Sequence, residues 1–159
     1  MIKVVDNFLP KNEFVKIRDV ICAKDFPFFY NGFVTDENSP SNDYYFTHLF
    51  YSGLFVDPNC HIFVDILNQL EVKSLIRIKA NLYPSTDNIE YQSEHIDYDY
   101  EHRGAIFYLN TNNGFTTLEN GTKVESMQNR LLLFDPSKPH NSTTCTDDKC
   151  RVNVNFNFF

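Results

Sequence analysis

Residues 151–159 read Arg-Val-Asn-Val-Asn-Phe-Asn-Phe-Phe, and polar and apolar side chains alternate strictly over residues 151–158. A period of two predicts a β-strand, because successive side chains of a strand point to opposite faces of the sheet. The polar face carries one arginine and three asparagines: Arg151, Asn153, Asn155 and Asn157. An exposed surface strand would show this pattern, and so would a strand whose polar face lines a wet cavity.

Residues 76–83 alternate in the same way. The apolar face of this segment carries Ile78, Ala80 and Leu82, and its polar face carries Arg77, Lys79, Asn81 and Tyr83. The polar faces of the two predicted strands match, so the strands would together line a polar pocket inside the fold.

Two helices are predicted in the first half of the chain. One begins near Leu9-Pro10 and has apolar residues at helical spacing, namely Phe14, Ile17 and Ile21. The other begins at Asp57-Pro58, an N-cap followed by proline at the first helical position, and its apolar stripe is Ile62, Ile66 and Leu70. Residues 35–43 read as a polar loop.

From residue 74 onward the pattern indicates short strands, at 76–83, 104–110, 115–119, 122–126, 131–134 and 151–159. Asn120-Gly121 is a strong signal for a two-residue hairpin. Helices followed by six or more strands indicate a mainly β fold, a sandwich with the N-terminal helices packed on one sheet. No repeat, linker or low-complexity segment is present, so we expect residues 1–159 to form a single domain.

The net charge is −7, from 14 basic and 21 acidic residues. A nucleic-acid partner would need a basic face, so this balance weighs against one. No apolar run approaches the roughly 18 residues that span a bilayer, and no secretory signal is present. We therefore expect a cytoplasmic protein that makes no membrane association. The sequence does not predict an oligomeric state.

The four cysteines, Cys22, Cys60, Cys145 and Cys150, form no CxxC pair. Cys145 and Cys150 bracket a turn-like stretch and could face each other across a hairpin. A reduced cytoplasmic setting disfavours a disulfide there.

His95, Asp97 and His140 form a candidate metal-binding set. A histidine and an aspartate two positions apart on an extended segment point to the same face, so both can reach one ion. His140 follows the predicted 131–134 strand and its turn, at a sheet edge. Two imidazoles and one carboxylate can occupy one face of Fe(II) and leave positions open for a co-substrate and O2. Zinc could bind the same three residues and activate water.

Arg151 begins the last predicted strand, 11 positions after His140. A planar guanidinium binds a carboxylate through two parallel hydrogen bonds, and a buried arginine without an anionic partner is costly. A dicarboxylate between Arg151 and the metal would satisfy both groups, which favours iron over zinc.

The other histidines have no nearby residues that would complete a comparable metal-binding set. His102 lies between Glu101 and Arg103, so we expect it in a solvated, charge-rich turn. His61 lies on the second helix beside Cys60, and adjacent helical residues diverge.

The pattern resembles the Fe(II)- and 2-oxoglutarate-dependent dioxygenases, specifically the small prolyl-4-hydroxylase-like type found in phages and bacteria. The resemblance covers nearly the whole chain, through residues 4–9, 78–84, 111–116, 134–140 and Arg151. It implies a double-stranded β-helix (a cupin-like jelly roll) with iron at its open end.

The resemblance also implies roles for individual residues. His95, Asp97 and His140 would ligate Fe(II), and Arg151 would bind the distal carboxylate of 2-oxoglutarate. Further co-substrate contacts would come from Asn81, Tyr83 and Asn153. The implied reaction consumes O2, converts 2-oxoglutarate to succinate and CO2, and hydroxylates a C–H bond of the substrate.

Two departures from the family pattern concern the substrate. Many prolyl hydroxylases carry a tryptophan shortly after the arginine, and this sequence has no tryptophan. The nucleic-acid alkylation-repair branch carries a second arginine six positions after the first, where this chain has Asn157. This substitution, together with the acidic charge, argues against a DNA or RNA demethylase.

Four functions therefore compete. A dioxygenase could hydroxylate a protein or peptide side chain, with proline as the first candidate, or it could act on a free small molecule. A metal hydrolase could use the same ligands with Glu94 or Asp99 as general base, but it leaves Arg151 unexplained. A non-enzymatic jelly-roll module could hold a sugar or an acid in a polar lumen.

Substrate selection is expected at the rim of the site, from loops 35–43 and 84–93, since binding residues usually lie on loops around a rigid scaffold. Tyr98, Tyr100 and Arg103 follow the first two metal ligands and are the candidate substrate contacts. They could equally be ordinary exposed loop residues.

Overall fold

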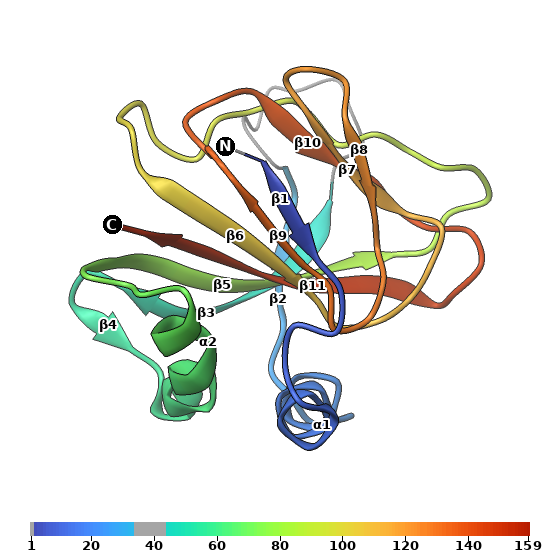
Figure 1. Cartoon of the computed structure of the whole chain (residues 1–159). Helices are drawn as coiled ribbons and strands as arrows, with labels where there is room; N and C mark the ends of the chain where they lie inside the picture. The colour runs from blue at the N-terminus through green and yellow to red at the C-terminus, as the bar shows by residue number, and fades with distance from the viewer. Residues whose placement is uncertain (1, 34–43) are drawn as a thin grey trace.

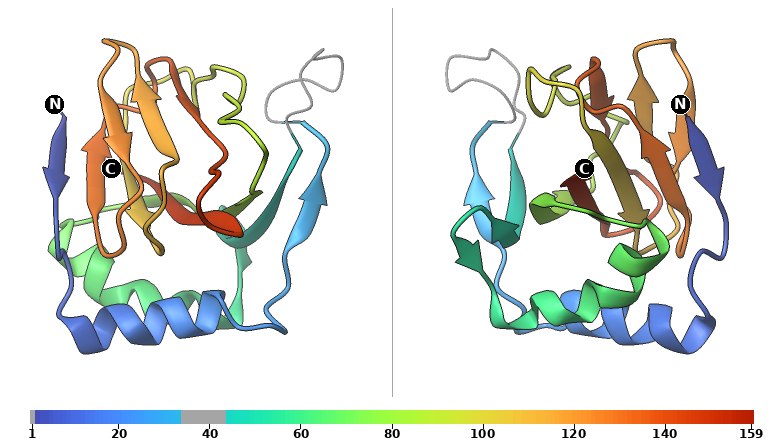
Figure 2. Two further views of the ribbon diagram at one scale, coloured as in Figure 1. Left: turned by 90° about the vertical axis from the view of Figure 1, so that its right-hand side faces the viewer. Right: turned by 60° about the vertical axis from the view of Figure 1, so that its left-hand side comes forward.

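The computed structural model describes residues 2–33 and 44–159, so the loop predicted at 35–43 lies outside the described residues. A large antiparallel sheet forms the centre of the molecule, with helices on one face and a small sheet on the other (Figure 1, Figure 2). The predicted mainly β jelly roll, with helices packed on one sheet, is confirmed. Among the described residues, no helix has the length and apolar character needed to cross a membrane.

The strands of the large sheet do not follow one another in sequence order, so most strands that are neighbours in the sheet are distant in sequence. Its strands in spatial order are β1 (Lys3–Val5), β9 (Leu131–Phe134), β6 (Arg103–Tyr108), β11 (Cys150–Phe158), β5 (Leu75–Pro84), β3 (Tyr45–Ser52) and β2 (Phe29–Asn31), with β4 (Phe55–Val56) paired to β3. The small sheet consists of β10 (His140–Ser142), β7 (Phe115–Leu118) and β8 (Lys123–Glu125). The predicted Asn120-Gly121 hairpin joins β7 to β8, and Gly121 has φ of 79°, which glycine adopts without a steric penalty.

The helical layer consists of α1 (Lys11–Ile21), the 3₁₀ helix η1 (Pro58–Phe63) and α2 (Val64–Gln69). Asp57 caps η1 as predicted, since its side chain accepts a hydrogen bond from the Asn59 amide at 2.8 Å. The second predicted helix therefore begins at the expected residue, although its first turns are 3₁₀ rather than α. Short 3₁₀ segments are common at the N-terminus of an α-helix.

The main hydrophobic core lies between this helical layer and the large sheet. The apolar face of β11 contributes fully or nearly fully buried side chains to it, namely Val152, Val154, Phe156 and Phe158. Phe63 of η1 packs edge-on against Phe156, with ring centroids 5.3 Å apart. Apolar burial against the helices thus fixes which face of β11 points toward them.

The opposite, polar face of β11 is also buried. Arg151 is 0% exposed, Asn153 2% and Asn157 1%. This burial excludes the surface-strand interpretation of the alternation and leaves the cavity interpretation. Because β5 and β11 are neighbours in the sheet, their polar faces lie side by side between the two sheets.

Candidate metal centre

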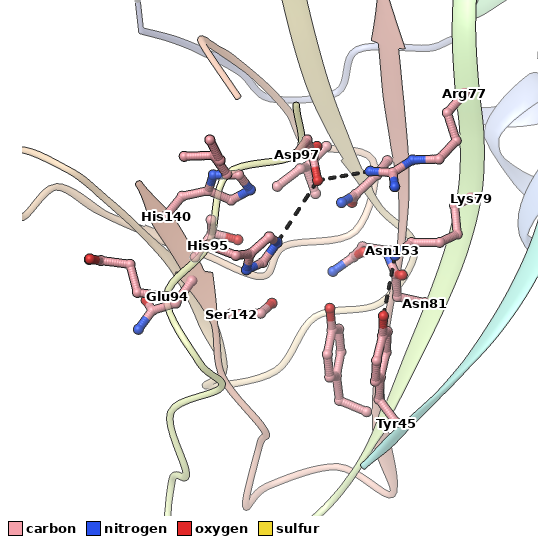
Figure 3. Close-up of a pocket in the computed structure, with 16 residues that line it drawn as sticks. Tyr45, Arg77, Lys79, Asn81, Glu94, His95, Asp97, His140, Ser142 and Asn153 are labelled. Carbon is pink, nitrogen blue, oxygen red and sulfur yellow. Dashed lines mark hydrogen bonds and ion pairs between the residues drawn. The ribbon is translucent and has the colours of Figure 1, made fainter. Parts of the chain in front are cut away.

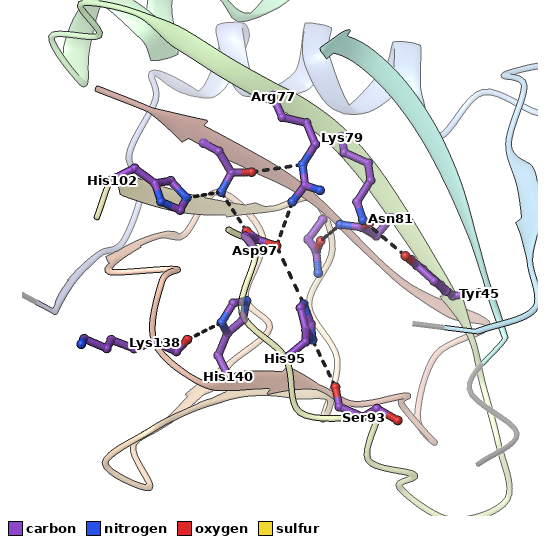
Figure 4. Close-up of polar contacts among 12 residues, drawn as sticks. Tyr45, Arg77, Lys79, Asn81, Ser93, His95, Asp97, His102, Lys138 and His140 are labelled. Atoms are coloured by element: carbon purple, nitrogen blue, oxygen red, sulfur yellow. Dashed lines mark hydrogen bonds and ion pairs between the residues drawn. The ribbon is translucent and has the colours of Figure 1, made fainter. Parts of the chain in front are cut away.

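Side chains from two distant segments meet at one point above the large sheet (Figure 4). His95, Asp97 and His140 place one nitrogen or oxygen atom each within 4.8 Å of one another. His95 Nε2 lies 3.9 Å from Asp97 Oδ1. The structure therefore brings together the three residues that the sequence predicts as metal ligands.

The segment carrying His95 and Asp97 is held against β10 by backbone hydrogen bonds. His95 and His140 form an antiparallel bridge, in which each amide donates to the other's carbonyl at 3.0 Å. The Asp97 amide donates to the Pro136 carbonyl at 2.9 Å. These backbone hydrogen bonds set the spacing of the three side chains independently of a metal ion.

The tautomers of both histidines suit metal binding. Nδ1 of His95 lies 3.1 Å from the Ser93 carbonyl, and Nδ1 of His140 lies 2.9 Å from the Lys138 carbonyl. A carbonyl only accepts, so each Nδ1 carries the proton and each Nε2 keeps its lone pair for the site. The buried Nε2 of His140 has no hydrogen-bond partner among the described residues. A metal ion would satisfy this nitrogen, so the residues fit the group that the sequence implies.

Asp97 is held by hydrogen bonds on both carboxylate oxygens. Arg77 Nη2 donates to Oδ1 and Asn157 Nδ2 donates to Oδ2, each at 2.8 Å. Burial raises the pKa of Asp97, but Arg77, His140 and Asn157 together hold it at about 2. Asp97 is therefore ionised at neutral pH, as a metal ligand must be.

His102 corrects the sequence prediction of a solvated turn. It is 5% exposed, and its Nδ1 lies 2.8 Å from the Tyr100 carbonyl. Asn157 Nδ2 donates to His102 Nε2 at 3.1 Å, while Arg77 Nε donates to Asn157 Oδ1 at 3.1 Å. His102, Arg77 and Asn157 thus form one polar chain behind Asp97. Sequence reasoning missed it because Glu101 and Arg103 point away from the interior, and their charge conceals the buried position between them.

Arg151 lies fully buried at the end of β11 near the small sheet. Its guanidinium donates to Ser142 Oγ, to Thr116 Oγ1 at 3.0 Å and to the Thr143 carbonyl at 3.2 Å. It stacks on two tyrosine rings, Tyr83 and Tyr108. No carboxylate of residues 2–33 or 44–159 pairs with it, and its Nε has no partner there.

A cavity of about 410 Å³ is lined by the three ligands and by Ser142 (Figure 3). Arg151 does not line it but lies directly behind its wall, because Ser142 and Thr116, which accept hydrogen bonds from the guanidinium, are both lining residues. The cavity walls are mostly polar, and they include the predicted co-substrate contacts Asn81, Tyr83 and Asn153. They also include residues that the sequence did not single out, namely Tyr45, Thr116, Asn141 and Ser142. These come from β3, β7 and β10, whose proximity to β5 and β11 depends on the strand order of the folded chain.

The predicted substrate contacts lie apart from this cavity. Tyr98 stacks on Tyr100 and packs against Arg77. Arg103 is exposed and lies over the Phe158 ring. None of the three lines the cavity, so their role remains a prediction. Of the two candidate bases for a hydrolase, Glu94 lines the cavity and Asp99 does not.

Cys145 and Cys150 are free thiols. Burial raises the pKa of both, so neither is an activated nucleophile.

No protein-family model matches the sequence, and no curated protein matches it either. Solved structures do match the fold. A prolyl-4-hydroxylase from Pseudomonas putida is 17% identical with a TM-score of 0.70, over 99% of this chain and 91% of that one. An oxidoreductase of the 2OG-Fe(II) oxygenase family from Burkholderia pseudomallei is 10% identical with a TM-score of 0.71, over 99% and 84%.

A third similar structure is a prolyl hydroxylase from Trichoplax adhaerens in complex with a peptide fragment of the hypoxia inducible factor oxygen degradation domain. It is 17% identical with a TM-score of 0.68, over 99% of this chain and 83% of that one. At this level of identity the comparisons establish the fold. The resemblance inferred from the sequence is thereby confirmed for the fold, over almost the full length of the chain.

Proposed function

We propose that this chain is an Fe(II)- and 2-oxoglutarate-dependent dioxygenase that hydroxylates a C–H bond. The observation that carries the proposal is Arg151, a fully buried guanidinium without a carboxylate partner among the described residues, next to a cavity that contains a three-residue metal site. The shared fold with 2OG-Fe(II) oxygenases and prolyl hydroxylases supports it.

The metal site favours iron chemistry. Two neutral imidazoles and one carboxylate on the same side of an ion match the ligand set of non-haem Fe(II) oxygenases, with positions left open for other ligands. Zinc would accept the same residues. A zinc hydrolase would then rest on Glu94, which is exposed, and it would leave the buried Arg151 without a function.

Arg151 favours a dicarboxylate co-substrate. A buried guanidinium needs an anion, and the fork of a guanidinium matches a carboxylate. Thr116 and Ser142, which also touch the guanidinium, line the same cavity and offer hydroxyl groups to the same oxygens. An acid held there by one carboxylate would direct its other end toward the metal site.

The bound iron would supply the O2 activation that couples conversion of 2-oxoglutarate to succinate and CO2 with transfer of one oxygen atom to the substrate. The chain's own contribution is positioning. His95, Asp97 and His140 would hold the ion, and Arg151 would orient the acid.

The substrate class is a protein or peptide side chain, with proline as the first candidate. The prolyl hydroxylase from Trichoplax adhaerens, which shares this fold, is in complex with a peptide fragment. A free small molecule is the alternative, and a non-enzymatic acid-binding module is the function that the experiment must exclude. A nucleic-acid substrate remains disfavoured by the −7 charge.

The first experiment is thermal unfolding with Mn(II), a redox-silent substitute for Fe(II), with and without 2-oxoglutarate. A ligand that binds only the folded state raises the melting temperature, by about 5 °C or more at 100 times its Kd for a chain of this size. We expect stabilisation by 2-oxoglutarate only when Mn(II) is present. Glutarate, which lacks the ketone, should stabilise less.

Two variants separate the two halves of the site. Arg151→Met should keep the Mn(II) effect and lose the 2-oxoglutarate effect, whereas His95→Ala should lose both. With Fe(II) and O2, the wild type should release succinate. If 2-oxoglutarate does not stabilise the Mn(II)-loaded wild type, the dioxygenase proposal is wrong. Binding without succinate release under any substrate mixture would instead favour the binding module.

A further inference from the structure

The cavity floor is a ladder of paired side chains from β5 and β11. The register places Tyr83 opposite Arg151, Asn81 opposite Asn153, Lys79 opposite Asn155, and Arg77 opposite Asn157. The first pair contains the Arg151 guanidinium, which has no carboxylate partner among the described residues, and both members of the fourth pair donate hydrogen bonds to Asp97. Lys79, in the third pair, lies two pairs from Arg151, which is about 13 Å along a strand.

Lys79 is a second cation of the cavity wall, beside Arg77, and it has no anionic partner among the described residues. Its ammonium group donates to the Tyr45 hydroxyl at 3.3 Å and lies 5.4 Å from the centroid of that ring (Figure 3). Within residues 2–33 and 44–159, no carboxylate lies within ion-pair distance of it. Burial, with Arg77 nearby, lowers the pKa of Lys79 to about 8, so the charged form is held at a cost.

Each of the other cations at the site has an anionic partner or would gain one from the co-substrate. Arg77 pairs with Asp97 at 2.8 Å. Arg151 would be matched by one carboxylate of 2-oxoglutarate, and the ion by the other together with Asp97. Glu94 is the remaining carboxylate of the cavity wall, but it is exposed and forms no ion pair with Lys79. Asp97 is then shared between Arg77 and the ion, so the filled site keeps an excess of positive charge, and Lys79 is the cation of the cavity wall that has no carboxylate partner among the described residues.

Beside Lys79, two amide oxygens lack hydrogen-bond donors. Asn155 Oδ1 and Asn81 Oδ1 are both buried without a partner among the described residues. Asn81 Nδ2 donates to Asn153 Oδ1 at 2.9 Å, so the Asn81 oxygen points away from Asn153. Ionised 2-oxoglutarate has only acceptors, so it cannot satisfy these oxygens. A ligand with an N–H group can.

From this arrangement we infer that the substrate presents a carboxylate to Lys79 and Tyr45, and a neighbouring N–H group to Asn155. The substrate class is then an amino acid, free or within a peptide, that carries a carboxylate close to the carbon that is oxidised. This inference rests on the proposed function, since it assigns Lys79 to the substrate and Arg151 to the co-substrate.

The test uses the full chain loaded with Mn(II) and saturating 2-oxoglutarate, to which small probes are added. N-acetyl-glutamate α-amide carries a side-chain carboxylate, and its isomer N-acetyl-glutamine carries an α-carboxylate. N-acetyl-glutamine α-amide is the uncharged control. We expect at least one acidic probe to raise the melting temperature further and the uncharged probe to have no effect. The isomer that binds identifies the source of the carboxylate.

Lys79→Met is the decisive variant, and Lys24→Met, at an exposed lysine, is its matched control. In Lys79→Met the affinity for the acidic probe should fall on the order of tenfold or more, the usual effect of a charge-assisted hydrogen bond, while the affinity for 2-oxoglutarate is unchanged. Lys24→Met should resemble the wild type in both measurements.

Three outcomes would overturn the inference without touching the proposed function. The acidic probes could fail to bind the loaded wild type, they could bind Lys79→Met as well as the wild type, or Lys79→Met could lose 2-oxoglutarate. The last result would assign Lys79 to the co-substrate. Failure of 2-oxoglutarate to bind the Mn(II)-loaded wild type would instead overturn the proposed function, and the inference with it.

Discussion

Lys79 shows how a single half-buried charge affects stability. The unfolded chain would release its proton near the ordinary pKa of 10.5, whereas burial lowers the folded pKa to about 8. Below pH 8 the folded state bears the full cost of the charge. Between about pH 8 and 10.5 the unfolded chain holds more protons than the folded chain, so stability rises with pH in this window.

Lys79→Met should therefore stabilise the ligand-free protein at pH 7, by on the order of 2 kcal/mol, since each pKa unit corresponds to about 1.4 kcal/mol. The gain should shrink as the pH rises from 8 to 10 and disappear above about 10.5. Urea unfolding of wild type and variant at pH 7, 9 and 10 measures it, with Lys24→Met as a control that shows no pH-dependent difference. An equal gain at pH 7 and pH 10 would contradict the stated cause.

Asn157 acts through Asp97 rather than on the ion itself. Removing its side chain would take one hydrogen bond from Asp97 Oδ2 and leave His102 Nε2 buried without a donor. Loss of such an outer contact typically weakens metal binding ten- to a hundredfold. We expect that increase in the Mn(II) Kd for Asn157→Ala, measured from the free Mn(II) signal in electron paramagnetic resonance.

Asn68→Ala, at an exposed position on α2, is the matched control and should bind Mn(II) like the wild type. A folded Asn157→Ala protein with an unchanged Kd would show that Arg77 alone is sufficient to orient Asp97.

At the scale of elements, the turn before β7 determines whether Arg151 can reach its position. A Cβ added at Gly114 would lie 2.6 Å from the Thr144 carbonyl oxygen and 2.7 Å from Arg151 Cδ. The same Cβ would also lie 2.9 Å from Asn112 Oδ1, so it would be crowded on a second side. A glycine is therefore required where the turn passes over the arginine stem.

Gly114→Ala should destabilise the protein by about 1–3 kcal/mol, the usual cost of overpacking, and displace the guanidinium. Binding of 2-oxoglutarate should weaken at least tenfold while Mn(II) binding is retained, both followed by thermal unfolding. Gly32→Ala is the control, since its Cβ would meet only side-chain atoms of Tyr30 at 3.4 Å. Equal loss of metal and acid binding in Gly114→Ala would indicate general unfolding instead.

At the scale of the whole molecule, the large sheet contributes to the hydrophobic core on one face and to the cavity on the other. The large sheet presents apolar side chains to the helices and polar ones to the cavity, so one strand such as β11 serves the core and the site together. A second, smaller core of Ile106, Tyr108, Leu118, Val124, Leu132 and Phe134 ties the small sheet to the large one. That core holds β7, and through its pairing with β7 also β10, over the polar face, which places Thr116 and Ser142 there.

The sequence by itself determined the alternation of β5 and β11, the Asn120-Gly121 hairpin, the Asp57 cap, the mainly β class and the group of His95, Asp97, His140 and Arg151. Each of these depends on local periodicity, on local turn chemistry or on the metal-binding and charge properties of a few side chains. All three can be recognised within short stretches of sequence. They required no knowledge of which strands are neighbours.

Only the tertiary structure decided that the polar face of β11 is buried, that His102 lies behind Asp97, and that Tyr45, Thr116 and Ser142 line the cavity. It also decided that Tyr98, Tyr100 and Arg103 lie outside that cavity. These facts depend on the strand order β6-β11-β5-β3 and on the small sheet above it. Burial depends on what packs against a residue. The packing partners of these residues are distant in sequence, so the local sequence pattern does not predict their burial.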